Sequence, residues 1–252
     1  MINTNFLTSS DIRKVIKYND KYSLVEYQKD VSVFPNTAQT AYFSSLMNVR
    51  KRQLAVTLDN DDVIIQAGAM QWFSGDVKVQ TDVKSAGDFM KKMVGASVTG
   101  ETAIKPKYSG TGIVVLEPTY KYLLQEDVGA WEGGMVIQDG LFLACDSTVS
   151  MKVVARKNIS SAALGGEGLF NTCLTGKGTV ILESSVPLEE LVVVELKDDV
   201  LKVDGSFAIA WTNTLNFTVE RTTSTLVGSA ASGEGLVNVY RGTGKVILAP
   251  VS

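Results

Sequence analysis

Apolar and polar residues alternate along much of this chain. In GDVKVQTDV (75–83), valines and a threonine alternate with charged and amide side chains. STVSMKVV (147–154) and TLNFTVE (214–220) show the same period of two, which is typical of strands with one buried face. Three short runs, VVL, VIL and VIL, follow glycines and predict fully buried strands. The pattern therefore predicts an all-β protein.

A glycine-containing strand pattern recurs three times. SGTGIVVLE (109–117), TGKGTVILE (175–183) and RGTGKVILA (241–249) place Gly110, Gly176 and Gly242 at intervals of 66 residues. A fixed period of this size indicates internal structural repeats, here small β-sandwiches or barrels. We divide the chain into N-terminal strands (1–45) and three repeats (46–118, 119–184 and 185–252). We expect one compact body, 1–252, with the repeats packed around a pseudo-threefold axis.

Two segments depart from this repeat. The first repeat carries about six extra residues in KSAGDFMKKMVGASVTG (84–100), where Phe89, Met90 and Met93 share a helical spacing. This spacing predicts one short helix near 86–95, the longest in the protein. In the N-terminal region, IRKVIKY (12–18) and YSLVEYQ (22–28) flank a polar Asn-Asp-Lys turn, which predicts a β-hairpin.

The composition excludes several kinds of chemistry. The chain has 252 residues, a net charge of −3 and no histidine, which excludes Ser-His-Asp and Cys-His catalysis and histidine-ligated metal sites. Cys145 and Cys173 lack a metal-ligand spacing, so we expect buried, reduced thiols. We expect no cofactor and no metal. The chain shows neither a signal-like apolar run nor a transmembrane segment, so we expect a cytoplasmic protein.

The Gly-x-Gly pattern has two interpretations. A phosphate-binding loop requires a helix after the glycines, whose N–H groups face the anion, but a β-branched strand follows each time. Tight β-turns are favoured instead, because glycine adopts positive φ without steric cost. The structural turn glycines are Gly110, Gly112, Gly176, Gly178, Gly242 and Gly244.

A Gly-Glu pair also recurs once in each repeat. Its carboxylates are Glu101, Glu167 and Glu234. Each could accept hydrogen bonds from backbone N–H groups and fix a turn. Alternatively, the three could converge near the pseudo-threefold axis and bind Ca²⁺ or Mg²⁺.

The repeats resemble a known family. GAMQWFSGDVKV, GGEGLFNTCLTGKGTVILES and SGEGLVNVYRGTGKVILAP are similar to the repeats of the altered inheritance of mitochondria protein 24 family, in the tryptophan RNA-binding attenuator protein-like group. The resemblance implies double-stranded β-helix units, a tendency to self-associate, and no enzymatic activity or catalytic residue. Mitochondrial members are linked to inner-membrane organisation, and bacterial members are also known.

Three functional hypotheses follow. The leading one is a non-enzymatic scaffold or interaction protein that acts as a homo-oligomer. The first alternative is a module that binds RNA or an anionic membrane, although the negative charge argues against nucleic acid. The second alternative is a small-molecule-binding β-barrel.

Overall fold

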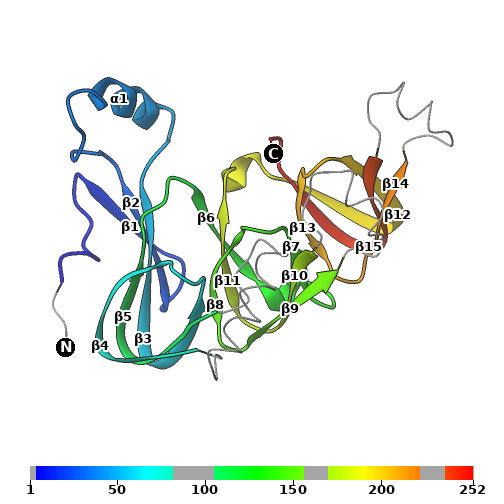
Figure 1. The fold of residues 1–252 in the computed structure, drawn as a ribbon, viewed down its shortest axis with the longest axis horizontal. Helices are drawn as coiled ribbons and strands as arrows, with labels where there is room; N and C mark the ends of the chain where they lie inside the picture. Colours follow the sequence, from blue (N-terminus) through cyan, green and yellow to red (C-terminus); the bar gives the residue numbers. More distant parts are fainter. Residues whose placement is uncertain (1–3, 82–104, 156–169, 222–235, 252) are drawn as a thin grey trace, which may run out of the picture.

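The fold is mainly antiparallel β-structure, as the sequence predicts. A computed structural model describes residues 4–81, 105–155, 170–221 and 236–251. These residues form two curled antiparallel sheets and one α-helix (Figure 1). The helix is α1 (Ala38–Leu46), and the 3₁₀ turns are η1 (Val128–Ala130) and η2 (Leu188–Glu190). None of the helices in these ranges is long and apolar enough to cross a membrane.

β1 to β5 belong to one sheet and β12 to β15 to the other, while the strands between them, β6 to β11, are shared between the two sheets. The eight-stranded sheet runs β1-β2-β3-β8-β11-β6, with β5 paired to β3 and β4 paired to β5. The seven-stranded sheet runs β12-β15-β13-β7-β10-β9, with β14 also paired to β15. The strands are β1 (Arg13–Lys17), β2 (Tyr22–Tyr27), β3 (Arg52–Ile65), β4 (Met70–Gln80), β5 (Lys107–Leu116), β6 (Tyr122–Asp127), β7 (Met135–Ile137), β8 (Phe142–Asp146), β9 (Val149–Ala155), β10 (Phe170–Gly176), β11 (Thr179–Ser184), β12 (Val192–Asp204), β13 (Ala208–Thr212), β14 (Asn216–Arg221) and β15 (Leu236–Leu248).

The N-terminal region contains both the predicted hairpin and a helix that the sequence pattern did not suggest. β1 and β2 pair antiparallel, from Arg13 opposite Tyr27 to Lys17 opposite Ser23, so the hairpin is confirmed. Residues 38–46, expected to belong to a region of strands only, form α1 instead. AQTAYFSSL has no period of two, and its alanines, glutamine and leucine favour helix. The helix predicted near 86–95 lies outside the described residues.

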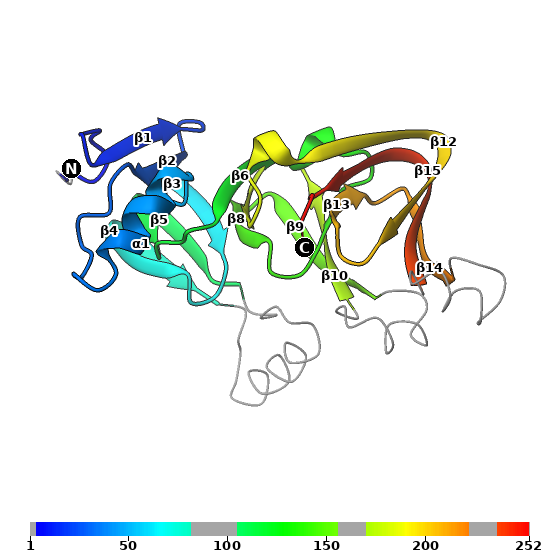
Figure 2. The same ribbon diagram turned by 90° about the horizontal axis from the view of Figure 1, so that it is seen from above.

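The three sequence segments lie in a row along the longest axis of the molecule (Figures 1 and 2). We call residues 46–118, 119–184 and 185–252 the first, middle and last segments. The middle segment joins both neighbours, because β8 pairs with β3 and β7 pairs with β13. Apolar clusters also cross these junctions; one combines Leu54 with Ile181, and another combines Val136 with Trp211. The count of three repeats and their boundaries stay predictions. The row differs from the expected packing around a pseudo-threefold axis, because among the described strands none of the first segment pairs with one of the last.

The repeated glycines lie where strands bend. Gly110 and Gly112 are inside β5, and Gly242 and Gly244 are inside β15, opposite register shifts in β3 and β12. Gly176 ends β10, and Gly178 lies in the short bend before β11. A Cβ at Gly112 would lie 2.0 Å from the backbone oxygen of Ser74. The close approach of β4 to β5 therefore explains why residue 112 is a glycine. β5 continues through this position as a bent strand.

Candidate interaction surface

Helix α1 stands away from the sheets (Figure 1), and large apolar side chains on it and beside it are exposed. No residue of α1 is buried, and Phe34 and Met47 on either side of it are 75% and 77% exposed. The helix ends where Asn48 adopts a left-handed φ of 61° and the Val49 N–H donates to the Ser44 carbonyl at 3.0 Å. The exposed large apolar residues of this region, which we call the α1 surface, are Val31, Phe34, Tyr42, Phe43, Leu46, Met47 and Val49.

The α1 surface carries no formal charge. Residues 31–49 include no Asp, Glu, Lys or Arg. Of the two charged residues next to this run, Arg50 has its Nη1 3.6 Å from Glu26 Oε1, and Asp30 is also in an ion pair. Lys51 Nζ lies 3.0 Å from a carboxylate oxygen of Asp30, and the Tyr120 hydroxyl donates to the same carboxylate at 3.1 Å. Desolvation by itself would raise the pKa of Asp30, but the hydrogen bonds from Lys51 and Tyr120 outweigh it and lower that pKa. The cations that follow α1 in the chain, Arg50 and Lys51, are thus paired with carboxylates of the same chain.

Arg52 anchors the chain where it leaves α1 and enters β3. Its side chain is 2% exposed, and its Nε donates to Glu26 Oε2 at 3.0 Å. The guanidinium lies over the ring of Tyr122, 4.1 Å from the centroid, and also donates to backbone carbonyls of Asn48, Arg50 and Tyr120. A buried arginine with this many acceptors fixes the base of α1 against β2 and β6.

A hollow of about 500 Å³ lies between α1 and the chain at the end of β2, beside Tyr120. Thr37, Ala41 and Ser45 line it from the helix side, while Tyr27 and Tyr120 line it from the opposite side. The walls combine small polar groups and aromatic rings with the charged side chains of Asp30, Arg50 and Lys51. Side chains of a bound partner would fit such a hollow beside an exposed apolar surface.

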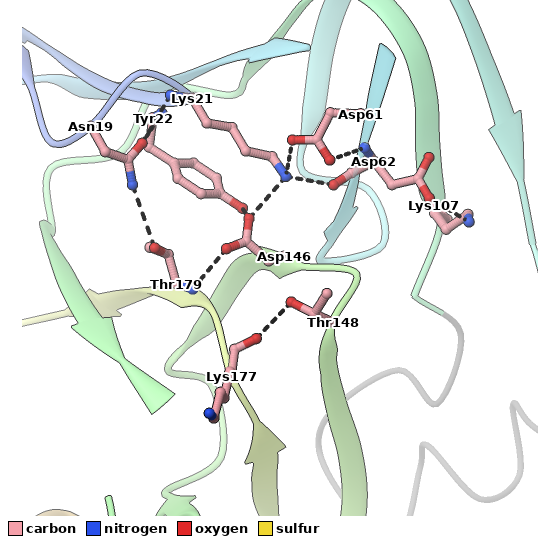
Figure 3. Close-up of polar contacts among 10 residues, drawn as sticks. All are labelled: Asn19, Lys21, Tyr22, Asp61, Asp62, Lys107, Asp146, Thr148, Lys177 and Thr179. Carbon is pink, nitrogen blue, oxygen red and sulfur yellow. Dashed lines mark hydrogen bonds and ion pairs between the residues drawn. The ribbon is translucent and has the colours of Figure 1, made fainter. Parts of the chain in front are cut away.

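A cluster of charged and polar side chains around Lys21 joins the N-terminal hairpin to the first and middle segments (Figure 3). Lys21 Nζ lies 2.8 Å from Asp61 Oδ2 and 2.9 Å from Asp146 Oδ1, and it donates to the Asp62 carbonyl at 2.6 Å. Asp146 also accepts from the Tyr22 hydroxyl at 2.9 Å and from the Thr179 N–H at 2.8 Å. Each of these groups is satisfied, so we interpret the Lys21 cluster as a structural junction.

Two groups in and beside this cluster, the Tyr22 hydroxyl and the Cys145 thiol, have raised pKa values. Burial, followed by the Asp146 carboxylate, raises the pKa of the Tyr22 hydroxyl far above its usual value. The same two causes raise the pKa of the adjacent Cys145 thiol to about 12. Both cysteines are free and buried, as the sequence predicts. A thiol with this pKa is protonated near neutral pH and is a poor nucleophile.

The predicted carboxylate site cannot be placed. Glu101, Glu167 and Glu234 all lie outside the described residues. Within the described ranges, no group of three or more Asp, Glu or Cys side chains could hold a metal ion. Sequence reasoning missed the α1 surface and the Lys21 cluster. The uncharged run 31–49 is a signal that could have revealed the first, whereas no local pattern marks the second.

The fold and these surfaces define a class of β-protein built from linked antiparallel sheets, with an exposed apolar helix at one end. The chain belongs to the family described as Mitochondrial biogenesis AIM24, whose profile matches residues 44–251. It is similar to an uncharacterised protein of Streptococcus pyogenes serotype M6, with 28% identity over 194 residues, covering 74% of this chain and 75% of that protein.

A solved structure shows a similar fold. The crystal structure of another Streptococcus pyogenes protein matches with a TM-score of 0.60 and 23% identity, covering 82% of this chain and 90% of that one. This likeness supports the arrangement of sheets described above.

Proposed function

We propose that this protein is a non-enzymatic scaffold or interaction protein that acts as a homo-oligomer. The observation that carries the proposal is the α1 surface, whose large apolar side chains are exposed on a helix with no buried residue. Monomeric proteins rarely leave contiguous apolar patches of this kind open to water, and such patches commonly mark interaction sites.

The occupant proposed for the α1 surface is the same surface of a second copy. Two uncharged faces meet around a twofold axis without like-charge repulsion, and both lose apolar area to water. RNA or an anionic membrane would instead require free cations beside the helix. Lys51 and Arg52, which follow the helix, are paired with Asp30 and Glu26. The charge pattern therefore favours self-association over the electrostatic alternatives.

The test compares the mass of the wild-type protein in solution with that of two matched variants, by light scattering after gel filtration. F43E/L46E places two charges on the α1 surface, while Q125E/S150E adds the same charge at exposed polar positions of β6 and β9, away from that surface. We expect an oligomeric wild type, a smaller species for F43E/L46E and no change for Q125E/S150E. A monomeric wild type at about 100 µM would refute the proposal, since association depends on concentration. Salt-sensitive binding to RNA or phosphatidylserine vesicles by that monomer would favour the alternative function.

A further inference from the structure

The two junctions between segments use the same strand register. Residues 63–65 of β3 pair antiparallel with residues 144–146 of β8, from Val63 opposite Asp146 to Ile65 opposite Ala144. Residues 135–137 of β7 pair in the same way with residues 210–212 of β13. In each junction, residues of the earlier segment on β3 or β7 thus pair with β8 or β13 of the later segment.

The last segment repeats one half of this junction without a partner. Met135 faces Leu174 on β10, and 66 residues later Leu201 faces Tyr240 on β15. Residues 201–203 of β12 therefore correspond to residues 135–137 of β7. β12 pairs only with β15 among the described strands, so its other edge is open in this part of the chain.

The first segment offers the other half. Phe73 faces Val114 on β5 as Cys145 faces Val180 on β11 and Trp211 faces Val246 on β15. Residues 72–74 of β4 thus correspond to residues 144–146 and 210–212. All three strands also shift register at the same place, just before these residues. β4 therefore has the shape that β8 and β13 use at their junctions, and it pairs only with β5 among the described strands.

Burial distinguishes the open ends from the closed junctions. Cys145 and Trp211, at the closed junctions, are 0% and 4% exposed, whereas Phe73 at the corresponding place on β4 is 38% exposed. On the opposite half, Val136 is buried and Lys202 is exposed. A strand laid against each open edge would remove Phe73 from water and satisfy unpaired backbone groups.

We propose that copies of this chain join head to tail, with residues 201–203 of β12 pairing antiparallel with residues 72–74 of β4 in the next copy. The register places Leu201 opposite Ser74, Lys202 opposite Phe73 and Val203 opposite Trp72. β4 and β12 lie at opposite ends of the row of segments (Figures 1 and 2), so the pairing joins two chains. The contact is heterologous and produces a closed ring or an open filament. It rests on the proposed self-association and adds a second contact to the α1 surface.

Cysteine cross-linking tests the register. F73C protein is mixed with K202C protein and oxidised, then separated without reductant. Opposed residues of an antiparallel pair lie within the Cα separation that a disulfide requires, about 4.4–6.8 Å. The native thiols Cys145 and Cys173 are buried and free. V153C, an exposed position on β9, replaces F73C in the matched control. We expect at least about tenfold more cross-linked dimer from F73C with K202C than from V153C with K202C, because only the first pair meets the disulfide geometry.

A second pair of variants tests assembly without a cross-link. F73E places a charge inside the proposed contact, while V79E places the same charge at an exposed valine of the same strand, outside it. We expect F73E to reduce the assembled mass and V79E to leave it unchanged. An oligomeric wild type with no preferential cross-link and with equal behaviour of F73E and V79E would overturn head-to-tail pairing while leaving the proposed function intact. A monomeric wild type would overturn both.

Discussion

Replacement of Lys21 by methionine should loosen the attachment of the N-terminal hairpin. Lys21 Nζ has three oxygen partners within 3 Å, and its side chain is 15% exposed. K21M keeps the aliphatic stem but leaves the Asp146 carboxylate, which is 22% exposed, without its cation. Breaking a fully buried pair costs about 3–5 kcal/mol. Because Asp61 is 47% exposed and water can solvate it, we expect a smaller loss of unfolding free energy, about 2 kcal/mol.

Urea unfolding of K21M and of a matched variant, K107M, measures this effect. Lys107 forms a 2.8 Å pair with Asp62, but the two side chains are 37% and 32% exposed. We expect K107M to lose less than about 1 kcal/mol, as is usual for surface pairs. Hydrogen exchange of the β1–β2 amides should also accelerate in K21M and not in K107M. Equal losses in the two variants would refute our interpretation of the Lys21 cluster as a structural junction.

Three further predictions concern pH, packing and thiol chemistry. Hydrogen bonds from Arg241 and then Thr218 lower the pKa of Glu220 to about 2, so the stability that this carboxylate contributes is present above its ordinary pKa of 4.5 and is lost as pH falls towards 2; thermal unfolding of E220Q should show a weaker acid dependence over that window than wild type. G112A should lower the melting temperature more than G68A, because only the first Cβ meets a backbone atom, at 2.0 Å. Iodoacetamide should modify Cys145 in urea and not in the native protein at pH 8, and equal rates would contradict the burial that raises its pKa to about 12.

The strand pattern revealed more of the fold than of its surfaces. Alternation and glycine spacing predicted the all-β class and the hairpin, because both follow from local backbone preferences. Helix α1 was missed since its side chains make no buried face, so AQTAYFSSL lacks the apolar periodicity that marks most helices.

No local sequence pattern could have predicted the Lys21 cluster. Lys21, Asp61 and Asp146 come from three places far apart in the chain and meet only because β2 and β8 both pair with β3. Acidic residues beside turns usually face solvent. Tertiary pairing decides which of them acquires a partner, and the sequence does not display that pairing.

The pairing of β3 with both β2 and β8 has a consequence for synthesis. A ribosome releases β1 and β2 before β3, so β2 is available to cover residues 52–56 of β3 as soon as that strand emerges. Residues 63–65 must wait for β8, which is made about eighty residues later. Each segment therefore has one strand edge that stays unpaired until the next segment has been made. Folding thus advances in the direction of translation. On β12 the corresponding edge, residues 201–203, has no partner among the described strands.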